Sequence, residues 1–169
     1  MKNIIIVQSS LAENSKTEVV SKDAYKILKE KKNVKVELLN LKKTKVPFCT
    51  GGKMETYGKE ENKLYKKLEK ADAYIFAFPV YNYSFSGVFK NFLDIFSGSM
   101  NDKVCGVIHN SGGIRSWGRG GDDLMRILAM HNNVTVVQPM VHTWRGDFEG
   151  NKINEEKVNE KLNGMIKTL

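Results

Sequence analysis

The chain has 169 residues, 41% of them apolar, and a formal net charge of +8. This length and apolar content predict a single compact domain over residues 1–169 with a sizeable core. Cys49 and Cys105 are too few for a disulfide framework and lack the spacing of a zinc or iron–sulfur site, so we expect no metal. No apolar run suits a signal peptide or a membrane span, and we therefore expect a cytoplasmic protein.

Strands and helices are predicted to alternate along the whole chain. The β-branched run 4–7 is typical of a parallel strand covered on both faces, whereas 34–39 has one partly wet face and suits a sheet edge. The predicted strands are 4–7, 34–39, 73–78, 104–109 and 134–137, and the predicted helices begin near residues 15, 64, 86, 122 and 155. The alternation predicts an α/β fold, a parallel sheet with helices on both faces joined by right-handed crossovers.

Segment 40–60 interrupts this alternation. It contains Pro47 and several glycines without clear periodicity, and a loop of this length is usually functional or mobile. Much of the positive charge lies before it and at its start, in Lys29, Lys31, Lys32, Lys35, Lys42, Lys43 and Lys45. No aromatic residues interleave with these lysines, so a solvated basic face is favoured over a nucleic-acid-binding module.

Ligands of such sheets bind beyond the carboxyl ends of the strands, near the point where strand order reverses. The loop after the first strand collects short hydroxyl and amide side chains at the start of a helix, namely Ser10, Asn14, Ser15 and Thr17. Together with free N–H groups and the helix dipole, they favour a phosphate. Ordinary helix capping by Asn14 or Ser15 is the simpler alternative. The loop has no glycine, which favours a mononucleotide over a dinucleotide.

The loop after the third strand combines aromatic rings with an amide and a hydroxyl. It reads Pro79, Val80, Tyr81, Asn82, Tyr83 and Ser84. A planar heteroaromatic ligand needs flat contacts on its faces and directed donors at its edges, and this segment offers both. From the residues alone, a packed aromatic turn is an equally good interpretation.

At this segment the sequence resembles the NADPH-dependent FMN reductase family, whose members carry a Pro-x-Tyr-Asn-x-Ser motif followed by Gly, a Lys-Asn pair and Asp. The matching residues are Pro79, Tyr81, Asn82, Ser84, Gly87, Lys90, Asn91 and Asp94. The first loop resembles the phosphate signature of the family through Ser10, Ser15 and Thr17, although Ala12 stands where an arginine is common. The loop after the fourth strand resembles the third flavin contact through Ser111, Gly112 and Gly113.

The resemblance implies a three-layer, flavodoxin-like fold with five parallel strands in the order 2-1-3-4-5, bound FMN, and NADPH or NADH as the electron donor. The implied activity is ping-pong hydride transfer to a quinone, an azo compound, free flavin or a similar acceptor, with no catalytic acid or base from the protein. Some relatives hold an iron–sulfur cluster with grouped cysteines, whereas Cys49 stands alone. Active sites of the family often lie at a subunit interface, and the apolar helix 85–96 predicts a homodimer or a higher homo-oligomer.

Other interpretations of the sequence are weaker. A flavodoxin-type FMN electron carrier without its own nicotinamide oxidation usually presents an acidic docking face, whereas this chain is basic. Segment 113–120 approximates a nucleoside-triphosphate loop, but Arg119 and Gly120 replace the lysine and the magnesium-binding hydroxyl. The histidines are predicted to be structural, with His142 and Trp144 beside the site.

Overall fold

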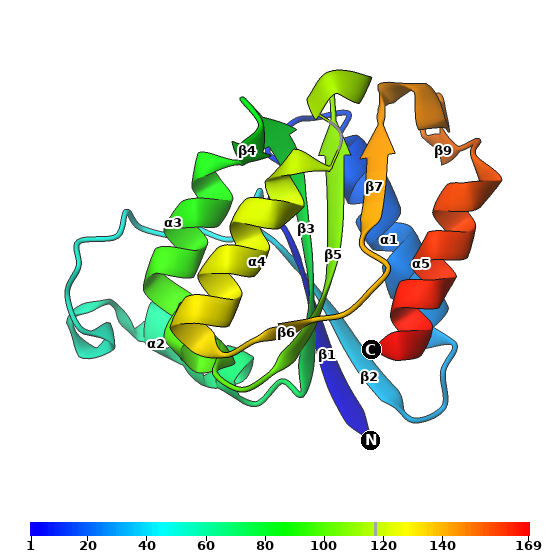
Figure 1. The fold of residues 1–169 in the computed structure, drawn as a ribbon. Coiled ribbons are helices and arrows are strands. Elements are labelled where there is room, and N and C mark those ends of the chain that lie inside the picture. Colours follow the sequence, from blue (N-terminus) through cyan, green and yellow to red (C-terminus); the bar gives the residue numbers. More distant parts are fainter. Residues whose placement is uncertain (117) are drawn as a thin grey trace.

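The computed structural model describes residues 1–116 and 118–169. Its centre is a parallel sheet in the order β2-β1-β3-β5-β6, in which β7 also pairs with β5 (Figure 1). The parallel strands are β1 (Lys2–Gln8), β2 (Val34–Asn40), β3 (Ala73–Tyr81), β5 (Val104–Ser111), β6 (Thr135–Val136) and β7 (Val141–Trp144). The predicted fold class and strand order are confirmed, with β5 as the fourth predicted strand and β6 with β7 in the fifth position.

Helices cover both faces of the sheet, as Figure 1 shows. They are α1 (Lys16–Lys29), α2 (Lys59–Glu69), α3 (Gly87–Phe96), α4 (Arg119–Asn132) and α5 (Glu156–Thr168). Alternate side chains of β1 enter two separate cores: Ile4 and Ile6 pack with α1 and α5, whereas Ile5 and Val7 pack with α3 and α4. This burial on both faces explains the continuous β-branched run, since each fully buried aliphatic side chain contributes about 1.5–3 kcal/mol.

The predicted strand ends are within two residues of the observed ones, with two larger differences. Strand β3 was expected to end at Phe78 because Pro79 cannot donate a hydrogen bond, but it continues to Tyr81. Ser9 N–H donates to Ala77 O, so the backbone groups of odd-numbered β3 residues face β1. Pro79 lacks a donor on this side, but β1 ends at Gln8, before the position where that donor would be needed. Strand β7 was not predicted at all, because Pro139 follows the last expected strand.

Short elements complete the chain. They are β4 (Ser84–Phe85), which pairs antiparallel with β3, the hairpin of β8 (Phe148–Glu149) and β9 (Lys152–Ile153), and the 3₁₀ helices Met54–Thr56, Ser97–Met100, Ile114–Ser116 and Arg145–Asp147. The helices α2 and α4 begin earlier than predicted, at Lys59 and Arg119. Among the described residues, none of the helices has the length and apolar character needed to cross a membrane.

The apolar helix α3 is used in the core. Phe89, Phe92 and Phe96 are completely buried, and Leu93 is almost completely buried. The rings of Phe78 and Phe89 stack with their centroids 5.2 Å apart. The width of the apolar face is therefore explained by packing against the sheet, and the phenylalanines of this helix do not form an exposed contact surface.

Candidate functional site

The loops after β1, β3 and β5 begin side by side at the carboxyl edge of the sheet. Gln8 is opposite Ala77, and Val80 is opposite Ser111. Ser9 N–H donates to Ala77 O at 2.9 Å, so the first loop leaves β1 directly against β3. Beyond β5, Trp144 of β7 lies opposite Ser111. The three segments singled out in the sequence thus meet at one edge, near the reversal of strand order.

The first loop presents the start of α1 to this edge. Ser15 is the N-cap residue, and its hydroxyl accepts a hydrogen bond from Glu18 N–H at 3.1 Å. Capping therefore explains Ser15. Ser10 and Thr17 are buried, whereas Asn14 is exposed. The N–H groups of the first helical turn have no carbonyl partner within the helix, and the positive end of the dipole suits an anion such as a phosphate.

Gln8 and Ser9, to which the sequence analysis assigned no role, support this loop through hydrogen bonds. Gln8 is fully buried; its Nε2 donates to Ser10 O at 3.2 Å, and its Oε1 has no hydrogen-bond partner among the described residues. The Ser9 hydroxyl donates to Ala77 O at 3.2 Å and lies 3.4 Å from the Ser86 hydroxyl. A signal was present, because both polar residues directly follow a run of buried aliphatic residues.

The third-strand segment is a tight hairpin between β3 and β4. Its two central residues have positive φ, 50° at Asn82 and 67° at Tyr83, which defines a type I′ turn. Asparagine tolerates this conformation, whereas a tyrosine does so at a cost. Tyr81 and Tyr83 are 53% and 57% exposed. Such exposure contradicts the interpretation as a packed aromatic turn and leaves both rings available to a ligand.

The other members of this segment have structural partners. Pro79 and Val80 lie buried within β3, so only their backbone groups can face a ligand. The Ser84 hydroxyl donates to Asp123 Oδ2 of α4 at 2.6 Å, which ties the hairpin to that helix. A Cβ at Gly120 would approach the Phe78 ring to 2.9 Å, so this glycine permits α4 to pack closely on β3. That packing role explains Gly120 without a nucleoside-triphosphate loop.

At its two predicted contact glycines the fourth loop leaves room among the described residues. Apart from its chain neighbours, a Cβ built at Gly112 or Gly113 would meet none of their atoms within 4 Å. The Ser111 hydroxyl donates to Gly113 O at 2.9 Å and fixes the start of the turn. Ile114, which follows, is 61% exposed. Trp117, which lies in the same predicted loop, falls outside the described residues.

A histidine pair lies behind this loop. The His109 ring stacks on Phe78 with a centroid separation of 5.6 Å, and its Nε2 contacts Nδ1 of His142. Burial and the neighbouring His142 lower the pKa of His109 to about 3. Burial and Lys161 also lower the pKa of His142, although Asp122 opposes this shift. Both rings are therefore neutral near pH 7, and one donates to the other, which agrees with the predicted structural role.

Exposed apolar side chains gather at the ends of the strands. Leu11 of the first loop is 51% exposed, and it adds to the exposed tyrosines of the hairpin and to Ile114. Each of the three loops thus contributes an apolar side chain beside backbone N–H groups. This combination fits the planar ring of a flavin, with the phosphate end at the start of α1. Among the described residues, no group of three or more His, Cys, Asp or Glu side chains is placed to hold a metal ion.

The fold defines a flavodoxin-like α/β protein, and the three adjoining loops lie at the sheet edge where ligands of such sheets bind. The profile of the family described as NADPH-dependent FMN reductase matches residues 1–146, and the chain belongs to this family.

Curated relatives match parts of the chain. It is 32% identical over 80 residues to the NAD(P)H-dependent FAD/FMN reductase of Geobacillus thermodenitrificans, covering 47% of this chain and 43% of that protein. It is 24% identical over 109 residues to the FMN-dependent NADH:quinone oxidoreductase of Pseudoalteromonas atlantica, covering 56% and 54%. The chain therefore spans about half the length of these two relatives.

Solved structures share the fold at low sequence identity. An apo NADH:FMN oxidoreductase has a TM-score of 0.83 at 19% identity, covering 99% of this chain and 88% of that one. The NAD(P)H:(acceptor) oxidoreductase FerB of Paracoccus denitrificans has a TM-score of 0.78 at 21% identity, covering 99% and 94%. An FMN-dependent NADH-azoreductase of Bacillus anthracis in complex with FMN has a TM-score of 0.59 at 16% identity, covering 99% and 97%.

Proposed function

We propose that residues 1–169 act as one FMN-binding domain of an oxidoreductase that takes electrons from NADPH or NADH and passes them to a quinone, an azo compound, free flavin or a similar acceptor. The observation that carries this proposal is the meeting of three loops at one sheet edge, each with an exposed apolar side chain. Membership of the FMN reductase family supports the same activity.

In this proposal, the start of α1 holds the phosphate through its free N–H groups and through Ser10, Asn14, Ser15 and Thr17. The ring lies against Tyr81 and Tyr83 of the hairpin and against the open turn at Gly112 and Gly113. Ser111 and Ser84 shape these two loops through their hydroxyls. Pro79 and Val80 contribute backbone and the rigid end of β3.

FMN, when bound, supplies the redox chemistry. The protein orients the ring, offers backbone N–H groups to its polar edge and leaves one face open to the nicotinamide and the acceptor in turn. Neither histidine of the pair has to move a proton, since His109 is 1% exposed and hydrogen-bonded to the half-buried His142. Ping-pong kinetics follow from two substrates using the same open face.

Two measurements test this function. The absorbance spectrum of the purified protein, with an FMN titration of any colourless fraction, is expected to show bound flavin. Steady-state oxidation of NADPH and NADH by the FMN-loaded protein is then expected in the presence of a quinone or an azo dye. A protein that rejects FMN overturns the site, whereas one that binds FMN but oxidises neither nicotinamide supports an electron carrier instead.

We also propose a cytoplasmic homodimer. The exposed apolar side chains Leu11, Tyr81, Tyr83 and Ile114 support a second subunit at the site edge, because exposed apolar side chains at one edge of a protein favour a contact site. Two free cysteines, one of them buried, suit a reducing compartment. Light scattering of the purified protein gives the mass directly, and a monomeric mass overturns the dimer.

A further inference from the structure

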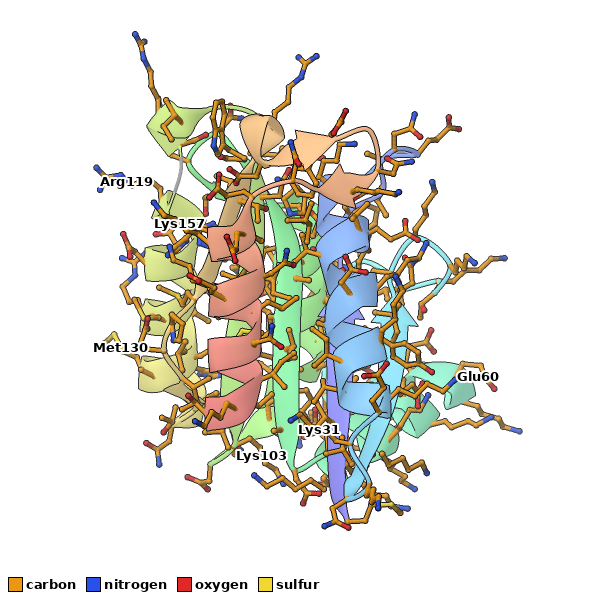
Figure 2. All side chains as sticks on the ribbon, turned by 90° about the vertical axis from the view of Figure 1, so that its right-hand side faces the viewer. Lys31, Glu60, Lys103, Arg119, Met130 and Lys157 are labelled. Atoms are coloured by element: carbon orange, nitrogen blue, oxygen red, sulfur yellow. The ribbon has the colours of Figure 1, made fainter. Side chains whose placement is uncertain are left out.

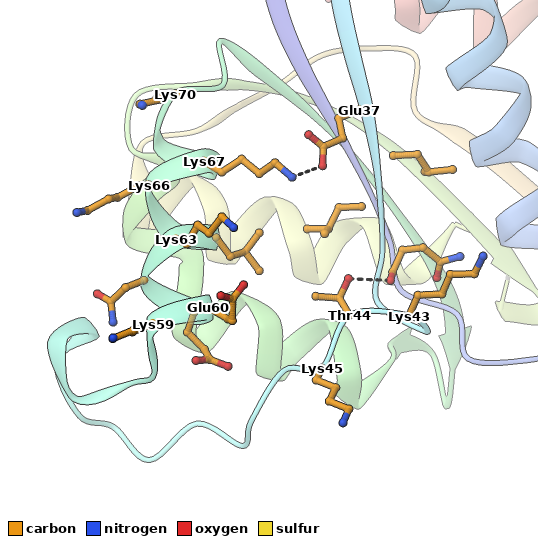
Figure 3. Close-up of a pocket in the computed structure, with 16 residues that line it drawn as sticks. Glu37, Lys43, Thr44, Lys45, Lys59, Glu60, Lys63, Lys66, Lys67 and Lys70 are labelled. Atoms are coloured by element: carbon orange, nitrogen blue, oxygen red, sulfur yellow. Dashed lines mark hydrogen bonds and ion pairs between the residues drawn. The ribbon is translucent and has the colours of Figure 1, made fainter.

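A hollow at the edge strand of the sheet begins beside the first loop, since Asn40, which lines it, is opposite Gln8 of β1. It is a groove of about 1170 Å³ between the edge strand β2 and helix α2, here called the β2–α2 groove (Figure 3). Leu38, Leu39 and Leu64 line its apolar part. Only Leu68 of α2 is buried, so this helix leaves part of the sheet face beside β2 uncovered. Lys67 of α2 reaches across to form an ion pair with Glu37 of β2.

The outer edge of β2 directs backbone groups toward open space. Lys2 N–H bonds Asn33 O, and Leu41 N–H bonds Gln8 O, so the odd-numbered residues of this strand face β1. In a parallel ladder the residues between them point the other way. Val36 and Leu38 therefore turn both N–H and C=O to the edge, where no other strand of the described chain pairs with β2. Such an edge is a template for an added strand.

The rim of the β2–α2 groove is strongly basic. Three glutamates line it, Glu37, Glu60 and Glu61, against seven lysines, which are Lys43, Lys45, Lys59, Lys63, Lys66, Lys67 and Lys70. Of these seven, only Lys67 forms an ion pair within the part of the chain that the structure describes. Unpaired lysines along an apolar groove favour an occupant with negative charge and some apolar side chains.

We propose that the β2–α2 groove docks an extended acidic segment of a partner protein, which adds as a strand along β2. Strand addition satisfies the edge groups of Val36 and Leu38, and alternate acidic side chains reach the lysines of α2. A second copy of this chain would bring the same lysines against the rim and be repelled. Nucleic acid is disfavoured because, among the residues that the structure describes, no aromatic side chain lines the groove for bases to stack on.

The probe is a fluorescein-labelled peptide of about eight residues with alternating glutamate and valine, the usual length of a strand. Fluorescence anisotropy with the wild-type protein is expected to show saturable binding. The same peptide with every backbone nitrogen methylated keeps its charges but cannot donate hydrogen bonds, and it is expected to bind at least about tenfold more weakly. Equal binding of the two peptides overturns strand addition.

A charge-reversal variant tests the rim. Lys63→Glu with Lys66→Glu is expected to weaken binding of the peptide at least about tenfold. The matched control, Lys31→Glu with Lys157→Glu, makes the same change of charge on exposed residues of the opposite side, labelled in Figure 2, and is expected to bind as the wild type does. An equal loss in both variants shows attraction by net charge alone and overturns the docking groove.

Backbone amide exchange locates the peptide. In the free protein the Val36 and Leu38 amides are expected to exchange quickly, and bound peptide is expected to slow both while leaving β1 unchanged. A DNA duplex that displaces the peptide and slows no β2 amide assigns the lysines to nucleic acid and overturns the proposal. These binding measurements need neither FMN nor a nicotinamide, so they are independent of the proposed oxidoreductase activity.

Discussion

Ser84 of the β3–β4 hairpin donates its hydroxyl to Asp123 of α4 at 2.6 Å. The serine of the sequence motif therefore links the hairpin to α4. Asp123 received no role from the sequence, because only the fold brings residue 123 against residue 84. Its carboxylate also lies 3.6 Å from Arg126 on the same helix.

Removing this link is expected to loosen the hairpin and weaken FMN binding. Ser84→Ala and Asp123→Ala are each expected to raise the Kd for FMN about tenfold, and the double variant is expected to be no worse than either single one. Asp123→Asn keeps an acceptor oxygen and is the matched control. FMN titration by fluorescence quenching gives the four values. If only Ser84→Ala weakens binding, the serine acts on the ligand directly.

Tyr83 is expected to lower the stability of the fold while its ring strengthens FMN binding. It has φ of 67° in a type I′ turn, where glycine is preferred. Tyr83→Gly is expected to raise the free energy of unfolding by about 1 kcal/mol by removing that strain, while weakening FMN binding through loss of the ring. Tyr83→Ala removes the ring but keeps the strain, so it is expected to weaken binding without the gain. Urea unfolding and FMN titration measure both effects; a Tyr83→Gly variant no more stable than Tyr83→Ala contradicts the argument.

Asn91 is expected to anchor the long loop between β2 and α2. Its Oδ1 accepts from Cys49 N–H and its Nδ2 donates to Pro47 O, each at 2.8 Å. Asn91→Ala is expected to lower the free energy of unfolding by about 1–2 kcal/mol and to speed amide exchange at Cys49. Asn91→Asp keeps the acceptor and is expected to protect that amide better than Asn91→Ala. Equal exchange rates in both variants would show that the loop is held in another way.

The sequence predicted the alternation of strands and helices because each buried run, such as 4–7, carries its own signal in side-chain type. It did not predict that β3 continues beyond Pro79. The strand accepts this proline because β1 ends before the position where Pro79 would have to donate a hydrogen bond, and the sequence does not show where β1 ends relative to β3. It also missed β7, whose His142 and Thr143 are polar residues made acceptable by partners on β5. Asn110 Nδ2, for example, donates to Thr143 Oγ1 at 2.9 Å.

In the candidate site, too, features set by neighbouring residues could be predicted from the sequence, whereas contacts between distant residues could not. The type I′ turn at Asn82 and the cap at Ser15 follow from residues close in sequence. The role of Asn91 in holding Pro47 depends on a contact across the fold, and the motif alone gives no reason for that asparagine. The apolar character of α3 predicted an exposed contact, whereas the strands of the sheet bury Phe89 completely.

The buried His109 is expected to make the fold sensitive to mild acid. The pKa of His109 is lowered to about 3 in the folded protein, from about 6.5 in the unfolded chain. The unfolded state therefore binds a proton first as pH falls, and stability is lost between about pH 6.5 and the folded pKa. The largest slope for one such group is about 1.4 kcal/mol per pH unit.

Replacing His109 is expected to remove this part of the pH dependence. His109→Gln is expected to be less stable than the wild type at neutral pH, because the stacking on Phe78 and the contact with His142 are lost. On acidification, however, its free energy of unfolding is expected to fall less steeply than that of the wild type. Urea unfolding at several pH values below about 6.5 gives the slopes. His131→Gln, at an exposed position of α4, is the control and is expected to keep the wild-type slope. If His109→Gln keeps it too, the acid sensitivity arises from the carboxylates and not from the pair.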